Sequence, residues 1–151
     1  MAQPPMRLEA PELEAVEAHI RDTVHHGRAI RDILGGHSGG PYDDAWEVQA
    51  AVEALGVFGS RWTIEILSAL YIVGAQRFNQ LKHLLAGISS RTLSDKLKLL
   101  EREGLLQRLV NQGPPIRVTY TLTDHGMSCG RLLSPLVAFL KLHHGSVDGP
   151  E

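Results

Sequence analysis

The sequence predicts a mainly helical protein with a small two- to three-stranded antiparallel sheet and an N-terminal helical extension. Apolar residues recur every three or four positions through most of the chain, which places them on one face of a helix. After Gly104 the interval changes to two on both sides of the loop sequence NQGPP, and that interval is typical of strands. The chain has 151 residues, of which 43% are apolar and 21% charged, so we expect one globular domain with an appended arm.

The first predicted helix covers residues 11–34. Pro11, followed by acidic residues, suits a helix start. The segment GGHSGGPYDD, residues 35–44, is rich in glycine and predicts a linker. The arm of residues 1–34 must therefore pack back onto the domain or onto a partner. Its apolar stripe consists of Leu13, Val16, Ile20, Ile30 and Leu34.

Four helices are predicted between the linker and Gly104. Asp43 or Asp44 should cap the first of them, and Gly74 should end the second. A tight connection at Gly87 and Ile88 joins the last two. The predicted ranges are 44–57, 62–72, 79–85 and 89–103.

A hairpin and a last helix complete a domain of residues 45–142, and a disordered tail is expected at 143–151. Thr123 should cap the last helix, and Pro135 should kink it or split it in two. Two short helices with a tight turn, then a hairpin and a helix, are the order of a winged helix-turn-helix, whose second helix enters the major groove of DNA. The strands and last helix are predicted at 106–110, 116–122 and 123–142.

The helix at 89–103 is predicted to be amphipathic. On a helical wheel, Leu93, Leu97 and Leu100 share the face toward the core. The opposite face is charged. It holds Arg91, Asp95, Lys98 and Arg102, flanked by Ser94.

The first turn of this helix is the segment that we expect to contact DNA bases. Ser89 is the predicted N-cap, and with Ser90 and Thr92 it offers hydroxyls and free N–H groups to a phosphate. Arg91 can bond guanine through two N–H groups. Asp95 can accept from cytosine or orient Arg91.

The charge is distributed unevenly. Residues 1–60 hold four basic and ten acidic residues, whereas residues 61–151 hold eleven basic and seven acidic ones. Within 77–117 there are eight basic and three acidic residues. Although the net charge of the chain is −2, the segment 77–117 is basic, which is compatible with nucleic-acid binding.

A plainer interpretation of these polar residues is also open. Arg91, Asp95 and Lys98 are spaced for intrahelical ion pairs on a solvated face. The hairpin is as polar as any exposed turn, although its two prolines reduce the entropy lost if it docks on DNA. Its polar residues are Arg108, Asn111, Gln112 and Arg117.

Three pieces of sequence, GSRWTIEILSALYIVGAQRFNQL, GISSRTLSDKLKLLEREGLL and RVTYTLTDHG, occur in this order within Gln49–Leu142. They resemble the HxlR family of winged-helix transcription regulators, which is related to the MarR type. The resemblance implies a homodimer on a pseudo-palindromic operator, with recognition by the fifth helix and the hairpin and dimerisation through the terminal helices. Arg77 and Arg91 match the family's arginines ahead of the fourth helix and on the recognition helix.

The sequence departs from the family pattern in three places. The cysteine that many members carry near the position of Gln49, and that some use to sense electrophiles, is absent. Ile116 separates the two prolines of the hairpin from Arg117. The arm of residues 1–45 is extra, and is expected to add to the dimer interface or to dock another protein.

Two residue sets follow from these arguments. The expected DNA-binding set is Arg77, Gln80, Lys82, Ser89, Ser90, Arg91, Thr92, Ser94, Asp95, Lys98, Arg108, Gln112 and Arg117. The expected dimer interface is Leu13, Val16, Ile20, Ile30, Leu34, Val48, Val52, Leu133, Val137 and Leu140.

The sequence shows no catalytic constellation, so we expect no enzyme activity, no cofactor and no metal site. The adjacent pairs His25-His26 and His143-His144 are poorly placed as joint ligands, since neighbours on a helix diverge. Cys129, the single cysteine, is expected to be a small buried residue rather than a redox sensor. Trp62 and Phe78 are expected to fill the core, with an effector cavity as the alternative.

The leading hypothesis is a sequence-specific, double-stranded-DNA-binding transcriptional regulator that acts as a homodimer in the cytoplasm. The N-terminus does not resemble a signal peptide, and the acidic arm disfavours a membrane partner. The alternative is a winged-helix protein–protein interaction module without sequence-specific DNA binding. The sequence leaves open whether a small-molecule effector exists.

Overall fold

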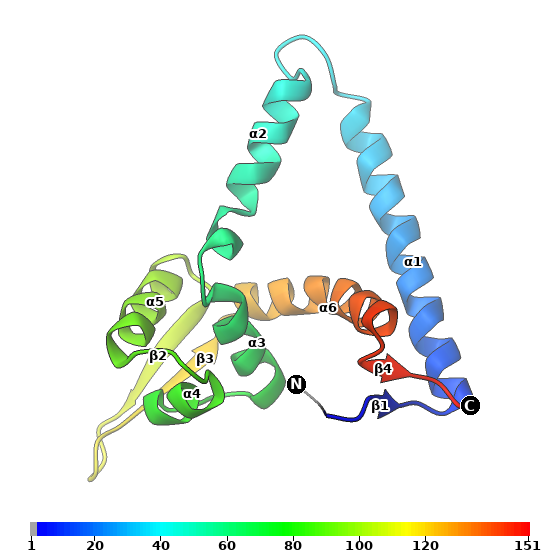
Figure 1. Ribbon diagram of the computed structural model, residues 1–151. Helices are drawn as coiled ribbons and strands as arrows, with labels where there is room; N and C mark the ends of the chain where they lie inside the picture. Colours follow the sequence, from blue (N-terminus) through cyan, green and yellow to red (C-terminus); the bar gives the residue numbers. More distant parts are fainter. Residues whose placement is uncertain (1–2) are drawn as a thin grey trace. The chain divides into compact units, whose positions relative to one another are not determined.

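The computed structural model describes residues 3–151 (Figure 1). It divides into two compact units, one of residues up to Val48 with Arg131–Glu151, the other of Gln49–Gly130. The prediction of a mainly helical fold with a small antiparallel sheet is confirmed. The elements are β1 (Met6–Arg7), α1 (Ala10–Gly35), α2 (Asp44–Ala54), the 3-10 helix η1 (Gly56–Gly59), α3 (Thr63–Val73), α4 (Phe78–Leu84), α5 (Ser90–Arg102), β2 (Leu106–Asn111), β3 (Arg117–Leu122), α6 (Asp124–His144) and β4 (Val147–Asp148).

The core of the unit Gln49–Gly130 is built mainly from leucines of α3, α4, α5 and the hairpin. Leu93 and Leu100 have no exposed surface and Leu97 retains 3%, which confirms the amphipathic pattern predicted for α5. Burying a leucine side chain stabilises a fold by about 1.5–3 kcal/mol, so these residues hold α5 with its polar face outward. The other buried apolar residues are Ile66, Leu67, Leu70, Leu81, Leu85, Ile88, Leu105, Leu106 and Leu122.

Three further residues pack at the edge of this core. Trp62 and Phe78 pack against it but are only partly buried, so the expectation that they fill the core holds in part. Cys129 is also only partly buried, and its thiol is free. The expectation of a buried cysteine therefore holds in part, and one side of Cys129 remains accessible.

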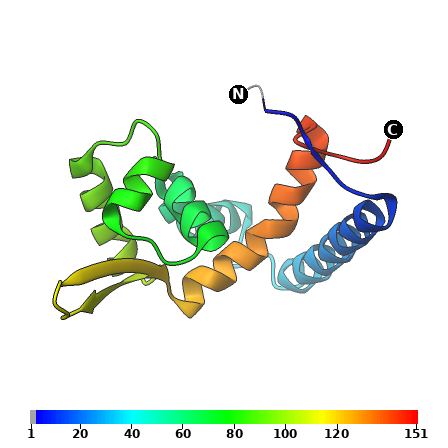
Figure 2. The ribbon, with the colours of Figure 1, turned by 90° about the horizontal axis from the view of Figure 1, so that it is seen from below.

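The hairpin is an antiparallel pair of β2 and β3, and it extends beyond the helices of its unit (Figure 2). The register runs from Leu106 opposite Leu122 to Asn111 opposite Arg117. Gln76 lies outside the two strands and forms an isolated antiparallel bridge with Tyr120, in which its N–H and C=O pair at 2.9 and 2.7 Å. This agrees with the predicted two- to three-stranded sheet.

The start of α6 is fixed to the end of the α5 region. The Thr123 hydroxyl accepts from the Gly126 N–H at 3.0 Å and donates to the Gly104 carbonyl at 2.6 Å, which confirms the predicted cap. Gly126 is required for the close approach, because a Cβ there would lie 2.0 Å from the carbonyl oxygen of Leu105. The backbone of α6 therefore touches the segment that enters β2.

Helix ends agree with the sequence in most places and differ in two. Asp43 caps α2 by accepting from the Trp46 N–H at 2.9 Å, and Gly74 ends α3 with a φ of 89°. The helix predicted to reach residue 57 ends at Ala54, and a separate 3-10 turn follows. Pro135 was predicted to kink α6 or split it in two, and the split does not occur: α6 is continuous across Pro135, since a proline removes only one backbone donor while the flanking turns stay bonded.

The other unit contains α1, which buries none of its residues in the single chain. Its C-terminal end is joined to α2 by Glu47, whose carboxylate accepts from Arg31 Nη1 at 2.6 Å and from the Ser38 hydroxyl. These two bonds, with that to Ser38 the stronger influence, hold the pKa of Glu47 below its ordinary value. The linker thus contains an ordered polar cluster.

The structure describes the C-terminal segment as helix and strand, in contrast to the disordered tail expected from residue 143. His143 and His144 complete α6, and β4 pairs in parallel with β1. The Met6 N–H donates to Ser146 at 3.0 Å, and the Leu8 N–H donates to Asp148 at 2.8 Å. The composition of the segment alone suggests disorder. The pairing of β4 with β1 joins the two ends of the chain, so it leaves no pattern in the local sequence. Across residues 3–151, no helix combines the length and apolarity needed to cross a membrane.

Candidate nucleic-acid interface

The connection between α4 and α5 is as tight as the sequence predicts. Gly87 has a φ of 92°, in the region that favours glycine. Ile88 is 5% exposed, and its N–H donates to the Leu85 carbonyl at 3.1 Å. This buried corner sets where α5 begins relative to α4.

The N-terminal turn of α5 is capped as predicted. The Ser89 hydroxyl oxygen accepts from the Thr92 N–H at 3.0 Å and lies 2.9 Å from the Thr92 hydroxyl. The N–H groups of Ser90 and Arg91 precede the first intrahelical bond and are not capped in the described chain. They carry the partial positive charge of a helix N-terminus, which suits an anion.

Lys82 adds a full charge to the same place. Its Nζ donates to the Ser90 hydroxyl at 2.8 Å, which joins α4 to the first turn of α5. The ammonium group, the Ser90 hydroxyl and the uncapped N–H groups therefore converge on one small surface. A phosphate oxygen is the ligand that such a set of donors prefers.

The charged face of α5 is exposed and free of ion pairs in the structure. Arg91, Asp95 and Lys98 are all exposed. The ion pairs within residues 3–151 are Arg7 with Glu151 and Arg31 with Glu47, so the intrahelical pairs of the plainer interpretation are not formed. Ser94 and Thr92 lie half-buried beside this face.

The hairpin presents its polar residues outward. Arg108, Gln112 and Arg117 are exposed. Asn111 accepts from the Gly113 N–H at 3.1 Å, and this local turn shapes the tip. A Cβ at Gly113 would lie 2.0 Å from the Pro115 carbonyl oxygen, so only glycine fits there.

Of the two predicted residues at the start of α4, only Gln80 uses its side chain in a structural bond within residues 3–151. The Gln80 side chain accepts from the Arg77 N–H at 2.8 Å and so caps the start of α4. Arg77 itself is exposed at that helix start. The Gln80 oxygen is thus already occupied, whereas the Arg77 guanidinium faces solvent.

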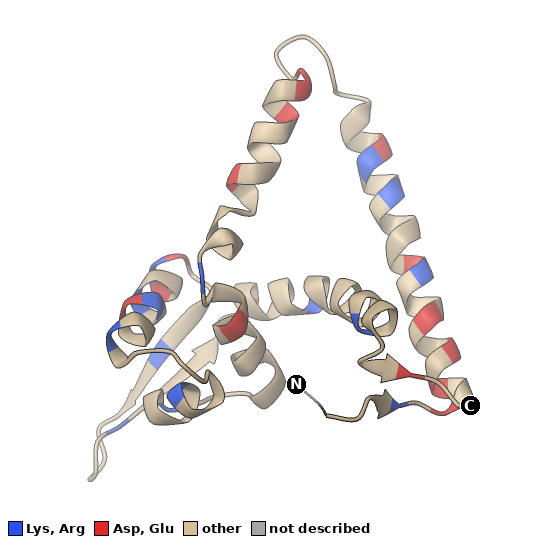
Figure 3. Ribbon diagram, viewed as in Figure 1, with Lys and Arg blue, Asp and Glu red and all other residues tan. Residues whose placement is uncertain are grey.

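Lys96 helps to hold α5 in place, and the sequence analysis did not identify it. Its ammonium group donates to the Ser60 hydroxyl, ahead of α3, and it is partly buried. It tethers α5 to a segment 36 residues earlier, a separation at which no sequence pattern could reveal it. Figure 3 shows Lys and Arg on α4, α5 and the hairpin, with Asp and Glu also on α5, whereas α2 carries Asp and Glu and α1 carries both signs of charge.

The ten predicted dimer residues fall into two groups. Leu13, Val16, Ile20 and Leu133 are half-buried within the chain, and Leu13 lies against Gly149. The others expose between 41% and 65% of their surface, which is unusual for large apolar side chains. They are Ile30, Leu34, Val48, Val52, Val137 and Leu140.

Comparison with known proteins extends these observations. A family model described as HxlR-like helix-turn-helix matches residues 57–147. The HTH-type transcriptional regulator YvaP of Bacillus subtilis is 36% identical over 84 residues, which cover 56% of this chain and 77% of YvaP. YtcD, another HTH-type transcriptional regulator of that organism, is 38% identical over 101 residues, 66% of this chain and 79% of YtcD.

Solved structures resemble the chain in the same way. A MarR-family transcriptional regulator from Enterococcus faecalis gives a TM-score of 0.56 at 30% identity, covering 66% of this chain and 86% of that chain. The reduced form of YodB from B. subtilis gives a TM-score of 0.55 at 27% identity, with 66% and 91% covered.

The family resemblance drawn from the three sequence pieces is thereby confirmed, and the match begins beyond the N-terminal arm. The chain belongs to the HxlR-like helix-turn-helix family, and it is a transcriptional regulator with a helix-turn-helix DNA-binding fold.

Proposed function

We propose that the chain acts in the cytoplasm as a homodimer that binds double-stranded DNA sequence-specifically. In this proposal α5 enters the major groove, and the hairpin lies on the flanking backbone or in the minor groove. Half-sites about 10 base pairs apart suit a two-fold dimer.

The observation that carries the proposal is the N-terminal turn of α5. The Lys82 ammonium group and the uncapped N–H groups of Ser90 and Arg91 form a phosphate-binding surface at the position where helix-turn-helix proteins meet DNA. Arg91 and Lys98 are exposed beside it and form no ion pair within residues 3–151, so no partner must be given up on binding. Arg91 is the residue that we assign to direct base contact.

The hairpin supports the same proposal. Arg108 and Arg117 are both exposed, and the prolines and the Asn111 turn restrict the tip. A restricted loop loses less entropy on binding than a flexible one. We assign Arg108, Gln112 and Arg117 to the flanking contact.

The exposed apolar residues support the homodimer. Val48 and Val52 each expose 65% of their surface on one face of α2, and Val137 and Leu140 on α6 expose 43% and 41%. Apolar residues that share a helix face and lie open in one chain are typical of an interface. We infer that a second copy covers them.

Binding assays with genomic fragments test the DNA-binding proposal. Affinity should fall steeply as salt is raised, because phosphate neutralisation releases counterions. Absence of binding even at low salt would contradict the proposal.

Arg91→Ala tests the base contact. It should weaken specific binding by about 1–3 kcal/mol and relax specificity at one base pair. Arg21→Ala, at an exposed basic residue of α1, is the matched control and should leave the affinity unchanged. Equal affinity of the Arg91 variant and the wild type would remove Arg91 from the interface.

Sedimentation tests the homodimer. The double variant Val48→Lys with Val52→Lys should shift the protein toward monomer without unfolding it, because both side chains are exposed in the single chain. Gln49→Lys, on a neighbouring face of the same helix, is the control. A double variant that stays as dimeric as the control would exclude this face of α2.

The alternative of a winged-helix protein–protein module is not favoured. The relatives that match the chain are named HTH-type transcriptional regulators.

A further inference from the structure

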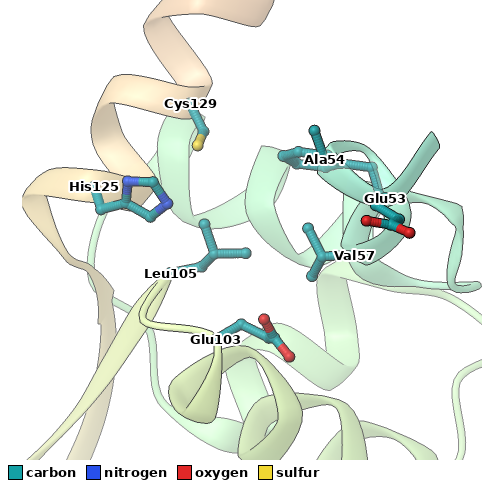
Figure 4. A pocket seen from close by; sticks show the side chains of 8 residues that line it. Glu53, Ala54, Val57, Glu103, Leu105, His125 and Cys129 are labelled. Carbon is teal, nitrogen blue, oxygen red and sulfur yellow. The ribbon is translucent and has the colours of Figure 1, made fainter. Parts of the chain in front are cut away.

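A cavity of about 280 Å³ lies within the unit Gln49–Gly130 (Figure 4). It is bounded by the end of α2, by η1, by the residues between α5 and β2, and by the first turns of α6. This volume lies just below the range of about 300–1,000 Å³ that is typical of ligand pockets, so only a small organic molecule would fit. None of its lining residues belongs to the predicted DNA-binding or dimer sets.

One part of the wall is apolar. Leu105 is 2% exposed, and Val57 and Phe58 are half-buried against the core. Ala54 adds a methyl group. These side chains offer a surface for a hydrocarbon or an aromatic ring, and burial of the ring there is favourable.

Another part of the wall is anionic. Glu53 and Glu103 line the cavity, no Lys or Arg does, and neither carboxylate forms an ion pair within residues 3–151. Figure 4 shows the two carboxylates near Val57, with His125 and Cys129 across the cavity. Glu53 accepts one hydrogen bond, from Gln49 Nε2 at 3.0 Å, so acceptor positions remain on both carboxylates.

The C-terminal ends of α2 and α5 add to the negative charge of the two carboxylates. Glu53 and Ala54 are the last residues of α2, and Glu103 is the C-cap of α5. The C-terminal end of a helix carries a partial negative charge and favours cations. Two helix C-termini and two carboxylates therefore meet at one cavity, which also has an apolar wall.

A metal ion is a poorer occupant than an organic cation. Among residues 3–151, no three His, Cys, Asp or Glu side chains group closely enough to hold a metal. The apolar wall would also remain unused by a bare ion. An ammonium group on an apolar body uses both parts of the wall.

We propose that this cavity binds a small organic cation with an apolar body, of the class of arylalkylamines, and that the bound cation alters DNA affinity. The second half rests on the proposed function. Glu103 directly follows α5, and Leu105 directly precedes β2, so a ligand between them contacts the ends of both DNA-binding elements. A ligand that binds one arrangement of the two element ends more tightly than another changes the affinity of the protein for DNA. Thermodynamic linkage then requires that bound DNA change the affinity for the ligand by the same factor.

The binding experiment uses the full chain without DNA and three probes of similar size: 2-phenylethylamine, 2-phenylethanol and phenylacetate. Calorimetric titration should give the tightest binding for the amine, weaker binding for the alcohol and none for the carboxylate. Equal binding of all three, or no binding of the amine, would overturn the cation site.

Charge variants test the assignment of the two carboxylates. Glu53→Gln and Glu103→Gln should each weaken amine binding about twofold to fivefold, because both side chains are exposed and this is the range of an exposed charge pair. The double variant should lose the preference for the amine over the alcohol. Glu65→Gln, exposed on α3 and outside the cavity, should behave as wild type. An unchanged double variant would overturn the assignment.

The reactivity of the Cys129 thiol tests whether the amine binds in this cavity. The amine should slow its alkylation by iodoacetamide in the wild type, and should do so less in the double variant. Alkylation at the same rate with and without saturating amine would place the amine elsewhere. A thiol that is unreactive from the start, with no amine bound, would mean that a second copy fills the cavity, which also overturns the proposal.

A DNA titration with and without saturating amine tests the coupling. A shifted dissociation constant supports it, and an unchanged one overturns the coupling while the calorimetric result for the site stands. Failure of the proposed function has a different signature, because the protein would then bind no DNA in the absence of amine, whatever the calorimetry shows.

Discussion

The ammonium group of Lys82 donates to the hydroxyl of Ser90 at 2.8 Å, and this bond joins the two helices of the helix-turn-helix. Ser90 is the first residue of α5, so the bond places a positive charge next to N–H groups that the Ser89 cap leaves uncapped. A side chain on one helix thus completes an anion-binding surface that begins on the next.

Lys82→Ala should remove one phosphate contact from DNA binding. We expect weaker binding on all sequences, and a slope of log affinity against log salt that is smaller by about 1. The free energy of unfolding should change by no more than about 1 kcal/mol, because Lys82 is exposed. Titrations at several salt concentrations provide the measurement, with Lys141→Ala as the control. An unaltered salt slope would argue against the contact.

Ser89→Ala should destabilise the fold by about 1 kcal/mol, because the Thr92 N–H loses its acceptor at the start of α5. Urea denaturation measures the loss. Ser90→Ala is the matched control, and since its hydroxyl does not cap the backbone, its effect should stay within about 0.5 kcal/mol. Equal stability of the two variants would mean that the cap contributes nothing.

Gly126→Ala should destabilise the fold by about 1–3 kcal/mol, because its Cβ would lie 2.0 Å from the Leu105 carbonyl oxygen and force α6 away. Gly27→Ala is the control within another helix, where nothing lies within 4 Å of the added Cβ. That change should stabilise by up to about 1 kcal/mol, since alanine is the better helix former. Thermal unfolding of both variants tests the contrast, and a loss at Gly27 instead of Gly126 would refute it.

Glu47 should make stability depend on pH at the acid end. Its pKa lies below the ordinary value of 4.5 because Ser38 and Arg31 donate to its carboxylate. Its stabilising contribution is therefore complete above pH 4.5 and is lost as the pH falls through the lowered pKa. Unfolding of the wild type and Glu47→Gln should differ by a constant amount near neutrality and converge in acid. A difference that does not vary with pH would exclude the role of the charge.

The sequence by itself determined the local elements, because each depends on residues a few positions apart. The spacing of Leu93, Leu97 and Leu100 predicted which face of α5 is buried. Ser89 and Thr123 were recognisable as caps, since a cap needs only a hydroxyl and an N–H three residues later. The alternation around NQGPP predicted the hairpin, and the order of these elements predicted the fold.

Only the tertiary structure decided where each charge lies. Lys82 and Lys96 look alike in sequence and each donates to a serine hydroxyl, but Lys82 is exposed beside the first turn of α5, whereas Lys96 is partly buried against Ser60. The pairing of Met6 with Val147 and the cavity beside Leu105 likewise join segments that are distant along the chain. Such contacts arise from packing, because the free energy of bringing distant segments together comes from the whole core and not from the pattern within either segment.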